Sequence, residues 1–434
     1  MNMETIATMG ILLFKRSVLK RMVTGFAALA LLGSSLVFAQ QKPPIKIGFT
    51  MPLTGGLAAN GKAALLTMQM WKDDINAKGG LLGRQVEFIY YDDQTNPSLV
   101  TGFYSKLLDT DKVDLILGSY GTNMQVPPLP MVMQRKLYYV CLFGLDPNAR
   151  FNYSGYFQMQ PNGPNPAVDN TGTFLEAAML ANPKPKTIAI VGGDAEYPAV
   201  AMDGGRKNAK RLGLKVVYDN TYPPTTTDYA PIMRAIAATK PDIVMVNSYP
   251  PDTVGMVRAA YEVGLKTQVF GGPMIGTAFA AVKKQLGPLL NNVVGFEMYV
   301  PEPTIKFAGV EKFLERYQAV AVKEGVDPLG FYIPPFAYAM MQIVGEAVEK
   351  TQSLDQQKLI DYTHATTFQT VAGEIKFGAN GEWASPRALY VQYRNIEGND
   401  TEQFKKAGKA IILAPAKFKS GDIIAPFDGT QGKK

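Results

Sequence analysis

The stretch that decides the fold runs from Ile45 to Asp93 and reads IKIGFTMPLTGGLAANGKAALLTMQMWKDDINAKGGLLGRQVEFIYYDD. Apolar residues alternate near both of its ends, from Ile45 to Phe49 and from Val86 to Tyr90, which is typical of strands. Between these ends, apolar residues recur at helical spacing from Ala58 to Lys78. A strand, a helix and a second strand in this order predict a right-handed parallel unit.

Glycines mark the turns of this unit. Gly55 and Gly56 follow Thr54 after the first strand, and they let the backbone turn sharply and approach a ligand closely. Gly79 and Gly80 end the helix, because glycine adopts the left-handed conformation without steric cost. In open parallel sheets, ligands bind beyond the carboxyl ends of the strands, so a binding cleft is expected at this edge.

The rest of the chain repeats the alternation of strands and helices. Near-continuous apolar runs at 113–117 and 243–247 predict buried strands, and helical spacing recurs at 197–212 and 336–350. Strands that alternate with helices across both halves indicate largely parallel sheets. The predicted fold is α/β, with two doubly wound parallel-sheet lobes joined by a multi-strand hinge.

Each lobe is expected to consist of discontinuous segments. The predicted segments are residues 42–160 continued by 300–370 for the first lobe, 161–299 continued by 371–398 for the second lobe, and 399–434 for a C-terminal extension. Residues 156–160 and 293–300 are expected to be linking strands, and 371–377 a closing strand of the second lobe. Several chain crossings would form a hinge that permits closure around a ligand.

The N-terminal residues 1–39 have the pattern of a secretory signal peptide. Four basic residues between Lys15 and Arg21 precede a nearly continuous run of apolar or small residues at 22–38, and Ala39 ends an acceptable cleavage signal. An uncleaved membrane anchor is the alternative, but the apolar run is slightly short and is interrupted by glycine and serine. The protein is therefore expected to be periplasmic.

Composition argues against several classes of function. Residues 1–39 hold four basic residues and one acidic residue, so their removal lowers the formal net charge from +7 to +4. No block of five basic residues appears, and nucleic acid is not an expected partner. The single histidine, His364, and the single cysteine, Cys141, leave no zinc cluster and no credible Ser-His-Asp set. Cys141 lies in an apolar run and is expected to be a buried core residue.

Asp92 and Asp93 are the one pair of adjacent acids that suggests a metal site or an acid/base pair. They end a predicted strand, and capping of the next turn is the favoured interpretation. No catalytic residue, metal or cofactor is expected.

The Ile45–Asp93 stretch resembles the start of the periplasmic solute-binding proteins of the branched-chain amino-acid ABC importers, the leucine-binding type. The resemblance rests on the first strand, the Thr-Gly loop, the Asn-Ala-x-Gly-Gly-x-x-Gly pattern at Asn76 to Gly83, and the Asp-Asp strand end, and it continues to about Gly381. It implies a type I periplasmic binding fold that captures a small molecule by lobe closure. It also implies transient docking on an inner-membrane ABC permease, and a monomer.

Candidate ligand-binding residues lie in loops that follow predicted strands. They are Asn60; Tyr120, Gly121 and Thr122; Phe143, Gly144 and Leu145; and, from the second lobe, Tyr197, Tyr249 and Met274. The resemblance places Thr122 where relatives hold the ligand carboxylate with a hydroxyl, and free N–H groups at a helix start also favour an anion. It matches Tyr197 to a tyrosine of the family's site and Tyr249 to a second cleft aromatic.

Two departures from the family pattern bear on the ligand. Relatives have a small residue and a Ser or Thr in the third loop, where this chain has Phe143 and Leu145. They also carry an acid near 271–274 that pairs with the ligand ammonium, and this chain has none there, nor does Asp194 or Asp252 match that position. Burying an ammonium without a partner is costly. The expected ligand is a small amino acid, or an apolar or aromatic carboxylate or amide.

Two other classes of function remain open. A periplasmic ligand sensor or amide-type receptor that feeds a signalling partner would share this fold and pocket, and neighbouring permease and ATPase genes would argue against it. An enzyme is the third class, and turnover of a bound ligand by the purified protein would support it.

Overall fold

The computed structural model describes residues 42–430. The predicted signal peptide at 1–39 and the last four residues lie outside this range. The two parallel sheets follow from the alternation read in the sequence, and their carboxyl ends carry the loops that were expected to bind a ligand. Among the described residues, no helix combines the length and apolarity needed to cross a bilayer.

The first sheet has the strand order β2-β1-β3-β4-β5, and every pair in it is parallel. Its strands are β1 (Ile45–Met51), β2 (Val86–Asp92), β3 (Leu115–Tyr120), β4 (Tyr139–Phe143) and β5 (Tyr156–Gln158). Strands β3 and β4 are buried at every residue, as expected for a sheet covered on both faces. The linking strand expected at 156–160 is instead the edge strand β5 of this sheet, because its backbone completes the ladder beside β4.

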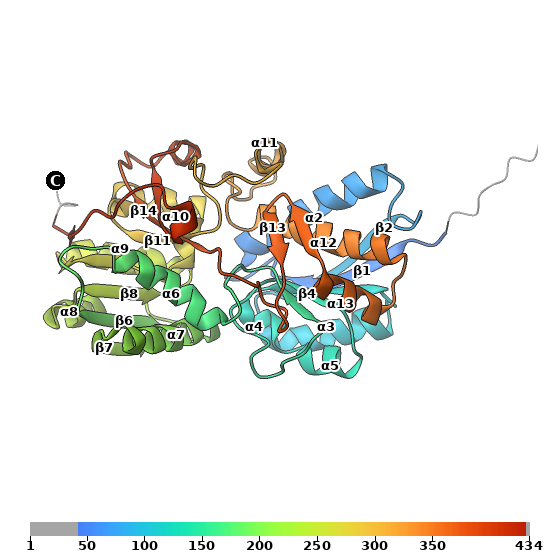
Figure 1. Ribbon diagram of the computed structural model, residues 1–434, viewed down its shortest axis with the longest axis horizontal. Helices are drawn as coiled ribbons and strands as arrows, with labels where there is room; N and C mark the ends of the chain where they lie inside the picture. Colours follow the sequence, from blue (N-terminus) through green and yellow to red (C-terminus); the bar gives the residue numbers. More distant parts are fainter. Residues whose placement is uncertain (1–41, 431–434) are drawn as a thin grey trace, which may run out of the picture. The chain divides into compact units, whose positions relative to one another are not determined.

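Helices from distant parts of the chain cover the first sheet (Figure 1). They are α2 (Ala58–Ala77), α3 (Pro97–Asp109), α4 (Thr122–Gln125), α5 (Leu129–Gln134), α12 (Pro334–Thr351) and α13 (Gln356–Ala365). Helices α2 and α12 contact each other, and Gly345 of α12 leaves room for the Trp71 ring, since an added Cβ would lie 2.7 Å from it. The two segments 42–160 and 334–365 therefore share one hydrophobic core.

The second sheet has the order β15-β14-β11-β10-β8-β6-β7. Its strands are β6 (Thr187–Gly193), β7 (Lys215–Tyr222), β8 (Ile243–Asn247), β10 (Val269–Gly271), β11 (Val294–Glu297), β14 (Leu389–Tyr393) and β15 (Ala410–Ala414). Strands β6 to β11 pair in parallel, and β14 and β15 add antiparallel strands at one edge. The prediction of a linking strand at 293–300 is thus partly wrong, because β11 is an internal strand of this sheet.

Five helices belong to the second half of the fold, and a sixth follows the chain crossing after β11 (Figure 1). They are α6 (Pro166–Ala178), α7 (Glu196–Leu212), α8 (Ala230–Ala238), α9 (Pro250–Glu262) and α10 (Ala280–Leu286), followed by α11 (Val310–Ala321). Helices α6 and α7 pack closely, since a Cβ on Gly204 would lie 2.1 Å from the Ala167 carbonyl oxygen.

The strand expected at 371–377 does not enter the second sheet. Strand β13 (Gly373–Lys376) pairs only with β12 (Thr367–Thr370), in a two-stranded antiparallel hairpin. Gly373 has φ of 83°, so it supplies the left-handed residue that a tight hairpin needs. The Phe377 ring, just beyond β13, lies 5.2 Å from the Phe157 ring of β5, which places the hairpin against the first sheet.

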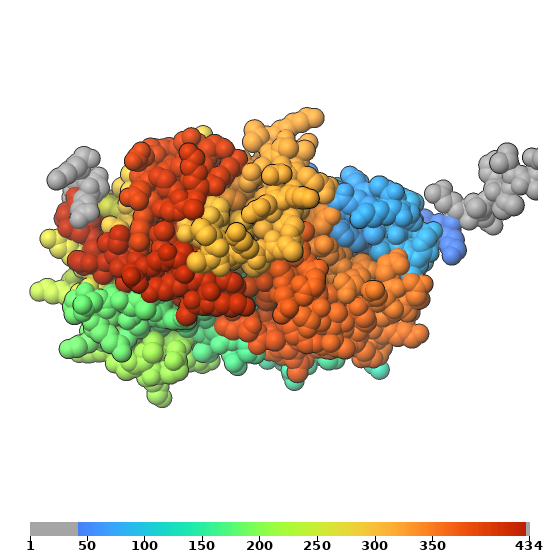
Figure 2. Space-filling model, turned by 45° about the horizontal axis from the view of Figure 1, so that its top comes forward, coloured from blue at the N-terminus to red at the C-terminus, as the bar shows by residue number. Residues whose placement is uncertain are grey.

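The C-terminal extension adds one strand to the second sheet and forms half of a separate two-stranded sheet. Strand β15 pairs with β14, and β16 (Phe427–Asp428) pairs with β9 (Lys266–Thr267). Figure 2 shows this C-terminal segment, in red, beside residues just after 300, in gold. Two hydrogen bonds join them: Thr304 Oγ1 donates to the Phe418 carbonyl at 2.6 Å, and Gly408 N donates to Glu302 at 2.6 Å.

Candidate functional site

A small cavity lies where the carboxyl ends of strands from both sheets meet. Its lining consists of Tyr120, Gly121, Thr122, Phe143, Gly144, Gln160, Tyr197, Tyr249, Ile275 and Tyr332. The volume is about 10 Å³, which is the room of about one water molecule. In this conformation the protein's own side chains fill the site, so a ligand larger than water requires the lining to move apart.

Seven of the ten predicted residues line this cavity. Asn60, Leu145 and Met274 do not. Asn60 and Met274 are 2% and 0% exposed, and Ile275 takes the position on the cavity wall that was predicted for its neighbour. Leu145 contributes through its backbone, because its N–H donates to Thr122 Oγ1 at 2.9 Å.

This bond determines what Thr122 can offer a ligand. Its oxygen already accepts from Leu145, and no bond from its own hydroxyl hydrogen to a described residue is found, so the hydroxyl remains a donor. Gly121 precedes it with φ of 102°, a backbone conformation that favours glycine, and donates its N–H to the Phe143 carbonyl at 2.7 Å. The first turn of α4 leaves the N–H groups of Thr122 and Asn123 without intrahelical acceptors. These donors suit an acceptor such as a carboxylate oxygen.

Two tyrosines of the second half face this loop. The Tyr197 and Tyr249 rings lie 5.6 Å apart, and the Tyr197 hydroxyl donates to the Pro273 carbonyl at 3.1 Å. The Tyr249 hydroxyl has no hydrogen bond to any residue from 42 to 430 that we can identify. Burial raises the pKa of both phenols, so both remain neutral hydroxyl groups at neutral pH.

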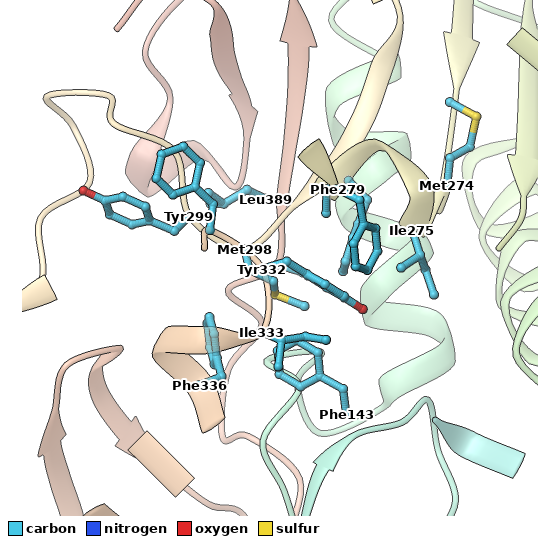
Figure 3. Packing of buried hydrophobic residues seen from close by; sticks show 14 of the residues in the cluster. Phe143, Met274, Ile275, Phe279, Met298, Tyr299, Tyr332, Ile333, Phe336 and Leu389 are labelled. Atoms are coloured by element: carbon cyan, nitrogen blue, oxygen red, sulfur yellow. The ribbon is translucent and has the colours of Figure 1, made fainter. Parts of the chain in front are cut away.

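Tyr332 is the principal residue that the sequence analysis missed. Its ring lies 5.2 Å from that of Phe143 and 5.0 Å from that of Phe279, between the two as Figure 3 shows. Its hydroxyl oxygen is 3.3 Å from that of Tyr120. Tyr332 thus contacts aromatic rings from both halves of the fold. It precedes α12 on a segment without strand or helical spacing, so no local pattern marks it.

The lining contains no ionisable acid or base other than tyrosine. Met274, at the position where an acid was sought, is an apolar buried side chain. Asp194 is exposed, and Asp252 lies outside the cavity with its carboxylate accepting from the Tyr222 hydroxyl at 3.0 Å. Within residues 42–430 no cluster of His, Cys, Asp and Glu could hold a metal ion. The cavity therefore offers hydroxyl and amide groups together with aromatic surface.

Buried glutamines hold the cavity loops in place. Gln125 Nε2 donates to the Ser119 and Phe143 carbonyls, each at 2.8 Å, at the ends of β3 and β4. Gln158 Nε2 donates to Gln125 Oε1 at 3.0 Å, and Gln158 Oε1 accepts from the backbone N–H of Gln160, a cavity residue, at 3.1 Å. This chain of bonds connects the loops to the crossing that follows β5.

Asp92 organises the first loop, as the capping interpretation predicted. Its Oδ1 accepts from Leu53 N at 2.9 Å and from Gln94 N at 2.8 Å, and its Oδ2 accepts from Thr54 Oγ1 at 2.7 Å. Burial acts to raise its pKa, but these hydrogen bonds, led by that of Thr54, outweigh burial and lower the pKa. Asp93 similarly accepts from Thr95 N and from Ser119 Oγ.

We expect Asp92→Ala to lower the free energy of unfolding by about 2 kcal/mol, because four donors, including the Thr54 N–H at 3.2 Å, lose a charged acceptor. Asp92 has a lowered folded-state pKa, so its contribution is present above the unfolded pKa of about 3.9 and is lost as pH falls below it. Urea unfolding at neutral pH measures the change, and Asp73→Ala, at an exposed position of α2, is the control. Equal stability of the two variants would contradict the assignment.

Comparison with known proteins agrees with this architecture. The model of the family described as "Periplasmic binding protein" matches residues 44–395. A Leu/Ile/Val-binding protein homolog of Brucella abortus is 26% identical over 390 residues, which cover 87% of this chain and 94% of that protein. The leucine-, isoleucine-, valine-, threonine-, and alanine-binding protein of Pseudomonas aeruginosa is 24% identical, covering 82% of this chain and 91% of its own length.

Solved structures show the same fold. The branched-chain amino acid transporter substrate binding protein of Streptococcus pneumoniae, in complex with isoleucine, superposes with a TM-score of 0.70 at 19% identity, over 86% of this chain and 100% of that one. A solute binding protein of an ABC transporter from R. palustris, in complex with benzoate, gives 0.69 at 18% identity, over 86% and 97%. Because the family model covers residues 44–395, the chain belongs to the periplasmic binding protein family.

Proposed function

We propose that this protein is the extracytoplasmic substrate-binding component of an ABC importer and that its ligand is a small apolar or aromatic carboxylate without an ammonium group next to the carboxylate. The observation that carries the proposal is the uncharged, tyrosine-rich cavity beside the Thr122 hydroxyl. The family relationship supports an extracytoplasmic location. The similar proteins named above are described as binding branched-chain amino acids in some cases and benzoate in another, so the cavity itself must decide between these classes.

The carboxylate end of the ligand is assigned to the first-lobe loop. The Thr122 hydroxyl and the N–H groups of Thr122 and Asn123 are donors without competing acceptors, and hydrogen bonds to a charged group contribute about 1.5–3 kcal/mol. The apolar part would contact Tyr120, Phe143 and Tyr249, whose rings suit an aromatic or aliphatic body.

An α-amino acid would place its ammonium next to its carboxylate, inside the same cavity. No carboxylate lines that cavity, so the ammonium would be buried without a counter-ion. Leaving a buried charge unpaired costs about 3–5 kcal/mol, which corresponds to a loss of affinity of roughly 100-fold or more.

Binding is proposed to shift the protein between open and closed forms. The first-lobe loops receive the carboxylate, and closure brings the second-lobe tyrosines onto the ligand and excludes water. A ligand stabilises the closed form by its differential affinity for that form. The closed protein, a monomer released by cleavage of its signal peptide, would dock transiently on the membrane permease, and no bond of the ligand is made or broken.

Titration calorimetry on the processed protein tests the proposal. We expect benzoate to bind at least about 100-fold more tightly than leucine, for the reason given above. Benzamide tests the charge of the ligand separately from its shape, because it keeps the ring and replaces the carboxylate by an amide. Tight leucine binding together with no response to benzoate would show that the proposed ligand class is wrong.

A further inference from the structure

A second cavity opens beside the first, and its volume is about 190 Å³. Tyr249 lines both cavities, and Asn123 of the second cavity directly follows Thr122 of the first. We call the first cavity the inner compartment and the second the outer compartment. Because they share the wall residue Tyr249 and are lined by consecutive residues of one loop, the two compartments are adjacent.

The walls of the outer compartment are mostly apolar. Leu57 comes from the loop after β1, and Pro198, Pro224 and Pro251 come from loops and helix starts of the second half of the fold. Proline and leucine side chains offer no donors or acceptors, so they fit the apolar body of a ligand. Like the inner compartment, the outer compartment is therefore completed by residues from both halves.

Its polar atoms differ in kind from those of the inner compartment. Asp252 Oδ2 accepts from the Tyr222 hydroxyl at 3.0 Å, and the Tyr229 hydroxyl lies 3.5 Å from Oδ1, the outer limit of a hydrogen bond. The backbone N–H groups of Tyr249 and Asp252 also interact with this carboxylate. No cation of residues 42–430 forms an ion pair with Asp252 that we can identify. Asn123 Oδ1 is buried and has no hydrogen-bond partner among the described residues. The outer compartment thus offers acceptors, while the Thr122 loop offers donors.

We propose that the ligand spans both compartments, with its carboxylate at Thr122, its apolar body beside Tyr249, and a hydroxyl or ammonium donor at its far end against Asp252 and Asn123. The ligand class is an elongated carboxylate with a terminal hydrogen-bond donor. This inference rests on the proposed function, because it takes the carboxylate end from it. It adds the length and the far end of the ligand, which the inner compartment alone does not determine.

The test compares ligands that differ only at the far end. Calorimetric titrations of the processed protein use benzoate, phenylpropanoate, para-hydroxyphenylpropanoate and para-aminomethylphenylpropanoate. We expect one of the two donor-bearing acids to bind at least about tenfold more tightly than phenylpropanoate, because a hydrogen bond to a charged group contributes about that factor. The hydroxyl and amine arms distinguish the two kinds of donor.

Asp252→Asn removes the charge and keeps the shape and one acceptor for Tyr222. We expect it to reduce the preference for the donor-bearing acid to less than about threefold, with benzoate binding unchanged. Asp203→Asn is the matched control, since Asp203 is an exposed carboxylate that pairs with Lys207 on α7 at 2.7 Å. Asn123→Leu is the second variant, because the Asn123 side-chain oxygen makes no hydrogen bond that the change would break, and it should also lower the preference.

The outcomes separate the two proposals. Equal binding of phenylpropanoate and both donor-bearing acids by the unaltered protein, or an equal response of Asp252→Asn and Asp203→Asn, would overturn the two-compartment ligand while benzoate binding continued to support the proposed function. Failure of all carboxylates to bind would overturn both. Loss of the preference in both Asp252→Asn and Asn123→Leu, with benzoate binding retained by Asp252→Asn, supports the two-compartment ligand.

Discussion

Replacing Lys283 by methionine is expected to lower the free energy of unfolding by about 3–5 kcal/mol. Lys283 Nζ lies 2.6 Å from Glu297 Oε1, and the two side chains are 1% and 0% exposed. The Tyr393 hydroxyl donates to the same carboxylate oxygen at 2.5 Å. Methionine matches the apolar stem of lysine but leaves the Glu297 carboxylate buried in the second half of the fold without a cation, and that is the costly state.

Urea unfolding followed by tryptophan fluorescence measures the loss. The control is the double variant Lys283→Met/Glu297→Gln, which removes both charges and should recover most of the lost stability, because no charge is then left unpaired. If the single variant matched the unaltered protein, or if the double variant were no more stable than the single one, the ion pair would not have the assigned role.

The effect of pH on the Lys283→Met variant follows from Glu297. Burial raises the pKa of this carboxyl, and Lys283 acts against that shift. Without the lysine the folded-state pKa rises further above the unfolded value of about 4.3. A raised carboxyl pKa imposes a penalty above the unfolded pKa that is relieved as pH falls through the folded pKa, so the stability deficit should be smaller near pH 5 than near pH 7.

The alternation of strand spacing and helical spacing in the sequence was enough to predict the two sheets. It was not enough to predict which sheet every strand joins. The strand–helix–strand unit at Ile45–Asp93 became β1, α2 and β2. The apolar run at 243–247 became β8, which is buried at every residue, as expected for a strand covered on both faces. The run at 371–377 was misplaced because a short alternating segment pairs equally well with any available edge. The turn at Gly373 is a local feature that lets this strand pair with β12, its neighbour in the sequence, rather than with a distant sheet edge.

Local sequence pattern likewise explains which site residues could be predicted and which were missed. Thr122 and Tyr249 follow strands, and the carboxyl ends of parallel strands meet at one edge of a sheet, so their placement could be predicted. Gln160 and Tyr332 lie on segments that cross between the two halves, after β5 and before α12. Their positions depend on how the halves pack, which local spacing does not encode. Asn60 was predicted from its loop; its side chain is buried and interacts with the Tyr120 hydroxyl, but it does not lie on the cavity wall.

The second large effect is expected at Gln125, where leucine should lower the free energy of unfolding by about 3 kcal/mol and weaken ligand binding about tenfold. Gln125 is 0% exposed. Leucine would remove the donor to the Ser119 carbonyl and one acceptor of Gln158 Nε2, which would keep only its bond to the Tyr156 hydroxyl at 2.7 Å. Each buried group that loses a partner costs about 1–3 kcal/mol. The Phe143 carbonyl would keep its bond from Gly121 N at 2.7 Å, so the loop would remain but would lose one of its two anchors.

Gln134→Leu is the matched control for this prediction, because it makes the same chemical change at an exposed position at the end of α5. Urea unfolding and benzoate titration on both variants separate the two roles of Gln125. A purely structural role lowers stability and leaves the affinity of the folded protein unchanged. A positioning role also raises the dissociation constant, because the Ser119 and Phe143 carbonyls fix the strand ends from which Tyr120 and Thr122 reach the cavity. If Gln125→Leu were as stable as Gln134→Leu and bound benzoate equally well, the buried glutamine network would have neither role.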